Sequence, residues 1–260
     1  MKIVGFSQLR NERDKGNLEH WLKCMSLCDA VYIYDHASDD GSQELYKQAA
    51  EYQKVVVIQA PKNMFTQELI CKASLMDQLK ANEPDADWVW WMDGDTLMDG
   101  RLLDETILRD MLSNHMDADG IRMGHYNLWR SDVWYRVDSA YHGFHTTGRV
   151  PFWRFPKIRN FPRNPGLHSG ANEFPRGIDA QRIARPMDYS LIHRGFATDA
   201  QILTKYHLYK GYGQRGWDLD RLIDEETLEV ARIPMEILPE WFEVVDDTDP
   251  TMKLKLKELM

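Results

Sequence analysis

The sequence predicts an α/β fold with a mostly parallel central sheet flanked by helices. Within residues 1–99, four short apolar segments alternate with longer segments whose apolar residues recur at helical spacing. That alternation is typical of βαβ units. The apolar segments carry almost no charge, as expected for strands that helices cover on both faces of a parallel sheet.

The elements of this first part follow one another in a regular order. Strands are expected at 2–6, 30–34, 55–59 and 88–92, and helices from about residue 17, at 42–52 and around 67–79. The first helix has the clearest signature, because its apolar residues are spaced i, i+3, i+4 and i+7: Leu18, Trp21, Leu22 and Met25.

Beyond residue 100 the chain carries short strands rich in aromatic residues. They are expected at 120–129, 133–137, 150–155 and 189–193, before helical segments that start at 198. A chain of 260 residues suits one domain better than two. We therefore divide a single domain, 1–260, into two halves, 1–99 and 100–215, and a C-terminal helical tail, 216–260.

The composition argues against several classes of protein. A formal net charge of -9 is unfavourable for a general nucleic-acid binder, which needs Lys and Arg to displace counterions. No stretch approaches the roughly 20 apolar residues that span a bilayer, and the apolar start at 3–6 lacks the features of a signal peptide. Cys24, Cys28 and Cys71 are too few for a disulfide framework. We expect a cytoplasmic chain, or one held peripherally at a membrane.

Polar clusters follow three of the four strands expected in the first half. They lie at 7–12, 35–42 and 93–99. In an open parallel sheet the carboxyl ends of the strands share one edge, where ligands collect. We therefore expect the three clusters to converge into one site.

Asp93 and Asp95, separated by Gly94, are the strongest candidates for a metal site. The spacing alone is weak evidence, because it recurs at Asp85 and Asp87, Asp117 and Asp119, Asp218 and Asp220, and Asp247 and Asp249. Only Asp93 and Asp95 follow an apolar strand that would carry both carboxylates to the ligand edge. Mg²⁺ and Mn²⁺ take such oxygen ligands together with diphosphate oxygens, and Gly94 allows a close backbone approach.

The order of these segments resembles that of GT-A glycosyltransferases, in particular the family 2-like enzymes. Its specific pieces are Arg10-Asn11-Glu12, Asp35 with the turn Ser38-Asp39-Asp40-Gly41-Ser42, and Trp91-Met92-Asp93-Gly94-Asp95. Looser pieces are Trp153-Arg154-Phe155, Gly166-Leu167-His168, Asn172-Glu173-Phe174 and Leu191-Ile192-His193. Together they span residues 3 to about 210. The sequence departs from the pattern at Asn172-Glu173, where relatives often have His-Glu.

This resemblance implies a GT-A (nucleotide-diphospho-sugar transferase) fold and a metal-dependent glycosyltransferase. Such an enzyme moves a sugar from a nucleoside-diphosphate sugar, with a UDP-sugar favoured, to a hydroxyl of a glycan or another acceptor, with inversion. Residues 1–99 would then form the nucleotide-binding half and residues 100–215 the acceptor and catalytic half. The implied cofactor is Mn²⁺ or Mg²⁺.

The resemblance also implies roles for single residues. Asp35 would bind the base or ribose, and Asp93 the ribose or metal, while Asp95 and His193 would ligate the metal. Glu173 would be the general base, with Asp179 and Asp188 as alternatives. The same donor site would be lined by Ser7, Arg10, Asn11, Glu12 and Ser38. Among the basic residues that would neutralise the diphosphate, Lys72 and above all Arg154 are favoured within a wider set that includes Arg149 and Lys205.

Three alternatives to a glycosyltransferase stay open on the sequence. A sugar nucleotidyltransferase would share the sheet and the metal carboxylates, but it is expected to have a Gly-rich loop after the first strand, and residues 7–12 contain no glycine. A non-catalytic nucleotide-sugar binding module would keep the fold without turnover. A metal-dependent phosphohydrolase would release monophosphate and phosphate.

Overall fold

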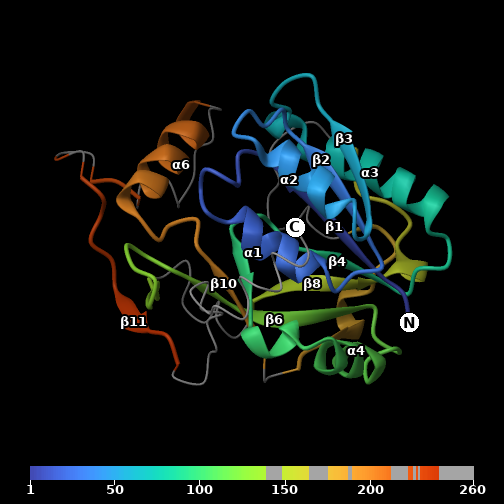
Figure 1. Ribbon diagram of the computed structural model, residues 1–260. Coiled ribbons are helices and arrows are strands. Elements are labelled where there is room, and N and C mark those ends of the chain that lie inside the picture. Colours follow the sequence, from blue (N-terminus) through green and yellow to red (C-terminus); the bar gives the residue numbers. More distant parts are fainter. Residues whose placement is uncertain are drawn as a thin grey trace.

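A computed structural model describes residues 1–138, 148–163, 175–186, 189–211, 222–224, 227 and 229–239. Its centre is a nine-stranded sheet with the order β3-β2-β1-β4-β8-β6-β10-β5 and with β9 beside β6 (Figure 1). The strands of this sheet are β1 (Ile3–Leu9), β2 (Ala30–Asp35), β3 (Lys54–Gln59), β4 (Trp88–Trp91), β5 (Thr96–Met98), β6 (Gly120–Asn127), β8 (Arg149–Arg154), β9 (Ile183–Ala184) and β10 (Ser190–His193).

Most of these strands run in one direction. β1 pairs in parallel with β2 and β4, β2 with β3, and β6 with β9 and β10. The exceptions in the described sheet are β8, which is antiparallel to β4 and β6, and β5, which is antiparallel to β10. The mostly parallel sheet expected from the sequence is therefore confirmed.

Helices cover both faces of the sheet. On one face, α1 (Leu18–Met25), α2 (Ser42–Ala49) and α4 (Glu105–Ser113) contribute to a core cluster that includes Trp21, Trp88 and Trp90. On the other face, α3 (Glu68–Asn82) packs its Ala73, Leu75, Met76 and Leu79 against a second cluster. Short 3-10 turns complete this part: η1 (Phe65–Gln67), η2 (Gly100–Leu103), η3 (Phe155–Lys157) and η5 (Ala180–Arg182).

A smaller unit lies beside the carboxyl ends of β6 and β10. It contains α6 (Asp199–Gly211) and an antiparallel pair of strands, β7 (Trp134–Arg136) and β11 (Met235–Ile237). Within 216–260, where a helical tail was expected, the described residues 235–237 therefore form a strand. The physical reason is that this segment pairs with β7, which lies about one hundred residues earlier in the sequence. The residues near 235 carry no local pattern that predicts this pairing.

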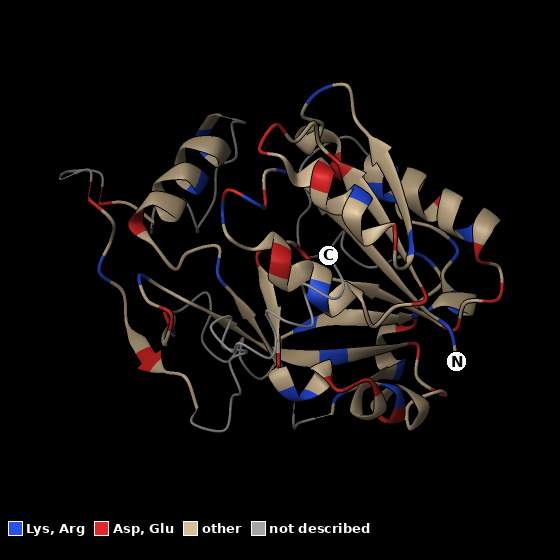
Figure 2. Ribbon diagram, viewed as in Figure 1, with Lys and Arg blue, Asp and Glu red and all other residues tan. Residues whose placement is uncertain are grey.

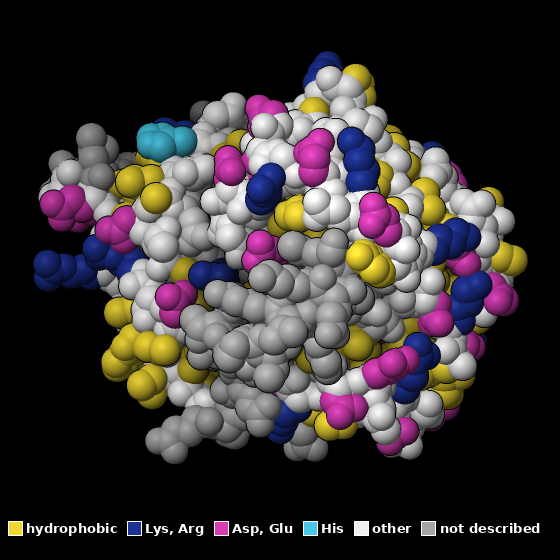
Figure 3. Space-filling view, viewed as in Figure 1, with side chains coloured by type: hydrophobic (Ala, Val, Ile, Leu, Met, Phe, Trp, Pro, Cys, Tyr) yellow, Lys and Arg dark blue, Asp and Glu magenta, His cyan; other side chains and the backbone are white. Residues whose placement is uncertain are grey.

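The two strands of this small unit carry an exposed apolar patch. Figure 3 shows hydrophobic side chains gathered at the lower left, over the place that β11 has in Figure 1. The exposed large hydrophobic residues of the two strands and their flank are Val133, Trp134, Met235 and Ile237. Elsewhere Lys and Arg alternate with Asp and Glu along the elements in view (Figure 2), without a basic stripe on the described ribbon.

The elements expected for residues 1–99 are confirmed with small shifts of their ends, whereas β5 and α4 were not expected at all. β5 begins directly after Asp95, in a stretch expected to be a polar loop. None of the helices in the described ranges is long and apolar enough to cross a membrane.

Candidate functional site

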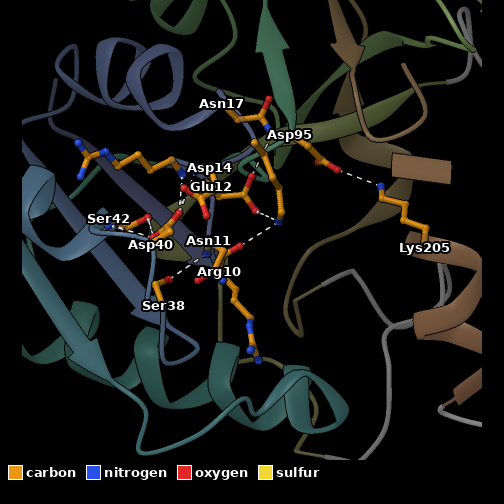
Figure 4. Close-up of polar contacts among 12 residues, drawn as sticks. Arg10, Asn11, Glu12, Asp14, Asn17, Ser38, Asp40, Ser42, Asp95 and Lys205 are labelled. Atoms are coloured by element: carbon orange, nitrogen blue, oxygen red, sulfur yellow. Dashed lines mark hydrogen bonds and ion pairs between the residues drawn. The ribbon is translucent and has the colours of Figure 1, made fainter. Parts of the chain in front are cut away.

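The three polar clusters meet at the carboxyl edge of the parallel strands, as expected. The buried Ser7 hydroxyl donates to the Met92 carbonyl at 2.7 Å and thereby joins the ends of β1 and β4. The Asn11 backbone N–H donates to Ser38 Oγ at 3.0 Å, and its side-chain amide donates to Asp39 Oδ1 at 2.7 Å. Figure 4 shows these loops facing one another. Ser7, Asn11 and Ser38 therefore form hydrogen bonds that connect the strand ends and loops of this edge to one another.

Asp35 ends β2 and is fully buried at this edge. Its Oδ1 accepts the Ser38 backbone N–H at 2.7 Å and the Gln59 side-chain amide at 2.8 Å. Beside it, His36 and Gln8 form a hydrogen bond of 2.9 Å between Nε2 and Oε1. Burial lowers the pKa of His36 to about 4, so this imidazole is neutral near pH 7. The carboxylate, amides and imidazole thus form one compact hydrogen-bonded cluster at this edge of the sheet.

Glu12 and Gly94 fit against each other. A Cβ on Gly94 would lie 2.6 Å from Glu12 Cγ, so only glycine leaves room for that side chain. Asn17 Nδ2 donates to Glu12 Oε2 at 3.0 Å, and Lys15 Nζ lies 2.6 Å from Oε1. Burial raises the pKa of Glu12, and the nearby Asp95 charge acts in the same direction. In this structure Gly94 thus makes space for Glu12, whereas the sequence suggested an approach of the backbone to a ligand.

Asp93 lies between an indole and a guanidinium. Trp91 Nε1 donates to its Oδ1 at 3.3 Å, and Arg149 Nη1 donates to its Oδ2 at 3.1 Å. The buried Lys72 of α3 lies 3.5 Å from the ring centroid of Trp91 and 2.6 Å from Glu68 Oε1. Lys72 therefore contacts the strand end through Trp91, while Arg149 is the cation that reaches the Asp93 carboxylate.

Asp95, His193 and Lys205 form the most compact charged cluster of the described site. Lys205 Nζ is 2.9 Å from Asp95 Oδ2 and 3.1 Å from His193 Nε2, and the same Asp95 oxygen is 3.1 Å from Nε2. Figure 4 shows Lys205 reaching from α6 toward Asp95. A Cβ on Gly195 would lie 1.9 Å from Lys205 Nζ and 2.6 Å from both Asp95 Oδ2 and His193 Nε2. Gly195 is therefore a site residue that the sequence reasoning missed.

The protonation of this cluster follows from burial and charge. Burial alone would raise the pKa of Asp95, but His193 and Lys205 beside it offset burial and hold that pKa well below its usual range. Burial lowers the pKa of His193, against the pull of Asp95. The imidazole is therefore neutral, and the tautomer decides which of its two neighbours, the Lys205 ammonium or the Asp95 carboxylate, forms a hydrogen bond with Nε2.

Asp95 and His193 fit a divalent cation as donor atoms. The Asp95 carboxylate oxygen and the neutral His193 imidazole nitrogen lie side by side. Both already contact one positive charge, the Lys205 ammonium. Among the described residues no group of three or more His, Cys, Asp or Glu side chains is arranged for a metal. Diphosphate oxygens would have to complete the shell of any metal that Asp95 and His193 hold.

Arg154, the favoured diphosphate cation, lies at the opposite edge of the sheet from Asp93 and Asp95. It is paired with Trp88, the first residue of β4, and its Nη1 donates to the Asp87 carbonyl at 2.8 Å. The reason is that β8 is antiparallel to β4, which puts the start of β8 beside Asp93 and its end away from it. Arg149, the first residue of β8, is the arginine of this strand that contacts Asp93.

Two of the three candidates for the general base lie outside the described residues, namely Glu173 and Asp188. The third, Asp179, is placed away from the site. Its backbone N–H donates at 3.0 Å to Asp119, which directly precedes β6, whereas His193 pairs with Asn127 at the other end of that strand.

Arg10 is half-buried in the loop after β1, and its carbonyl accepts from Lys15 Nζ at 2.9 Å.

Comparison with known proteins identifies solved structures with a similar fold. No family model matches the sequence, and no curated protein matches it by sequence. Among solved structures, TarS of S. aureus aligns with a TM-score of 0.52 at 13% identity over 80% of this chain and 40% of that chain. TarS 1-349 in complex with UDP-GlcNAc aligns with a TM-score of 0.52 at 13% identity over 84% and 68%. The chain thus spans two fifths of the first structure. The likeness confirms the expected GT-A fold.

Proposed function

We propose that this chain is a glycosyltransferase that takes a sugar from a nucleoside-diphosphate sugar, with UDP as the favoured carrier. The observation that carries the proposal is the convergence, at one edge of a GT-A sheet, of the hydrogen-bonded cluster around Asp35 with Asp93 and Asp95. This arrangement offers hydrogen-bonding groups to a nucleoside at one end and a cation-binding cluster to a diphosphate at the other. The UDP-GlcNAc complex of the structurally similar TarS supports the same class of donor.

The diphosphate would lie at the cluster around Asp95. Arg149 and Lys205 are the cations that reach the two carboxylates, and positive charge placed there stabilises the charge that develops on the leaving group. Asp95 and His193 would hold Mn²⁺ or Mg²⁺, which when bound supplies further positive charge to the diphosphate oxygens. Lys72, paired with Glu68 and stacked on Trp91, packs behind the strand end.

The reaction is a single displacement. The oxygen of an acceptor hydroxyl, on a glycan or a similar acceptor, forms a bond to the anomeric carbon while the bond from that carbon to the diphosphate oxygen breaks. The nucleoside diphosphate leaves with the electron pair, and the hydroxyl proton passes to a general base, for which Glu173 remains the candidate. Attack opposite the leaving group inverts the anomeric carbon.

The test is turnover of a panel of sugar nucleotides with Mn²⁺, measured as released nucleoside diphosphate. Wild-type protein is expected to release UDP slowly without an acceptor and faster with one. Asp95→Ala should lower the rate by about a hundredfold or more, because it removes the carboxylate that would hold the metal beside the diphosphate. Release of UMP and phosphate instead would identify a phosphohydrolase, and binding without release would identify a non-catalytic module.

The chain offers a matched control for this substitution. Asp117 belongs to an Asp-x-Asp triplet of the same spacing, but it is exposed and lies before β6, away from the ligand edge. Asp117→Ala should leave the rate of UDP release unchanged. Equal rates for Asp95→Ala and Asp117→Ala would refute the proposed donor site.

A further inference from the structure

Lys205 stands where the metal of the proposed function would stand. Its Nζ contacts both donor atoms, Asp95 Oδ2 at 2.9 Å and His193 Nε2 at 3.1 Å. A divalent cation bound to the same two atoms would lie about 2.0–2.2 Å from each of them. The ammonium and the metal would therefore occupy overlapping positions and repel each other.

The surroundings hold the ammonium in this position. Lys205 Nζ lies 4.6 Å from the ring centroid of Phe196, and the His193 ring meets the same phenyl ring edge-on at a centroid distance of 5.3 Å. Gly195 leaves the space that Nζ fills. The exposed fractions of the Lys205 and Asp95 side chains are 22% and 21%, so solvent reaches the pair.

Among the described residues, each of the two carboxylates already has a cation. Asp93 pairs with Arg149, and Asp95 pairs with Lys205. A divalent cation added alone would leave an excess of positive charge beside two fixed cations. A diphosphate that arrives with the metal brings the negative charge that removes this excess.

We propose that Lys205 is a resident cation of the site, which holds Asp95 and His193 in the donor-free protein and is displaced when a divalent cation enters with the donor diphosphate. This rests on the proposed function. It makes metal binding depend on the nucleotide, because the metal alone has to displace an ammonium, whereas the metal with a diphosphate provides that ammonium with a new anion. By linkage, the metal strengthens nucleotide binding to the same extent.

The test is titration of the full chain with Mn²⁺ alone, followed by the electron paramagnetic resonance signal of free Mn²⁺. Lys205→Met keeps the length of the side chain and removes its charge. It is expected to bind Mn²⁺ more tightly than wild type, on the order of tenfold, in the absence of nucleotide. UDP should strengthen Mn²⁺ binding to wild type more than to Lys205→Met. Lys205→Gln serves as a second variant, and the circular dichroism spectrum checks folding.

Two controls locate the effect. Lys210→Met removes the same charge from α6 on another side of the helix, where Lys210 Nζ bonds the Tyr206 hydroxyl at 2.6 Å, and it should leave Mn²⁺ affinity unchanged. Adding Asp95→Asn to Lys205→Met should abolish the gain. The proposal is overturned when folded Lys205→Met and Lys205→Gln bind Mn²⁺ no more tightly than wild type, including the case in which none of them binds it. Failure of UDP to bind any variant would instead refute the proposed function, while the titrations without nucleotide still decide the role of Lys205.

Discussion

At the scale of single residues, the site depends on glycines that let charged side chains meet. Gly195 follows His193 by two positions and packs against the tip of Lys205, which comes from α6. Asp95 directly precedes β5, His193 ends β10 and Lys205 lies in α6. The side-chain tips of all three meet beside Gly195. Catalytic constellations lose much of their rate when a group is misplaced by about 1 Å.

Gly195→Ala is predicted to damage the site without unfolding the chain. The new Cβ would lie 1.9 Å from Lys205 Nζ and 2.6 Å from the other two atoms, all of which are tips of side chains that can move. UDP release should fall on the order of a hundredfold, with little change in the melting temperature. Gly211→Ala is the control, because a Cβ there meets nothing within 4 Å. Equal rates in both variants would show that the cluster is not needed in this geometry.

A site residue can be predicted from the sequence when its neighbours in the sequence fix where it lies in the fold. Asp93 and Asp95 are predictable because a run of apolar residues directly precedes them and fixes where they lie. Lys205 and Arg149 were only members of a larger set of basic residues, since no local pattern says that α6 and the start of β8 reach Asp95 and Asp93. Gly195 has no sequence signal of its own, because its role comes from side chains that meet above it.

At the scale of elements, α1 is tied to the sheet through a buried histidine. His20 Nε2 accepts the backbone N–H of Met98, in β5, at 3.3 Å. Burial lowers the pKa of His20 to about 4, while an unfolded chain has an ordinary pKa near 6.5. Below pH 6.5 the unfolded chain therefore binds a proton that the folded chain does not, and the stability supplied by the neutral imidazole is lost as pH falls toward 4.

Wild-type protein is predicted to lose stability from this residue on acidification from pH 7.5 to 5, by about 2 kcal/mol. Urea unfolding at the two pH values measures the change in the free energy of unfolding. His20→Gln keeps an acceptor for Met98 but does not titrate, so its loss should be smaller than that of wild type by this amount. His36, also with a pKa lowered to about 4, remains in both proteins and cancels from the difference. Equal losses in the two proteins would contradict the account of His20.

Elements were predictable where a single segment carries the signal. The strands of residues 1–99 were recognised from apolar runs, and α1 from its periodicity. α4 was missed although Leu108, Met111 and Leu112 are spaced i, i+3 and i+4. The direction of β8 and the pairing of β11 with β7 depend on partners distant in the sequence, and therefore no local pattern revealed them. The sequence could therefore not show that Arg154 and Arg149 lie at opposite edges of the sheet.

At the scale of the whole molecule, both halves of the chain contribute to the same edge of the sheet. Strands β1 to β4 and their loops build the hydrogen-bonded cluster around Asp35, whereas β8, β10 and α6 bring Arg149, His193 and Lys205 to that edge. The apolar patch of the small unit lies over β11, below α6 in the view of Figures 1 and 3. The likeness to TarS covers 80% of this chain, so it extends over both halves.

The most direct test of the donor site is a crystal of the full chain soaked with UDP and MnCl₂, with anomalous diffraction recorded for manganese. The account predicts one anomalous peak about 2.0–2.2 Å from Asp95 Oδ2 and His193 Nε2, a diphosphate beside it, the uracil near Asp35, and Lys205 Nζ moved off the metal position. UDP bound away from the carboxyl edge of β1, β2 and β4, or a manganese peak that does not touch Asp95, would contradict it.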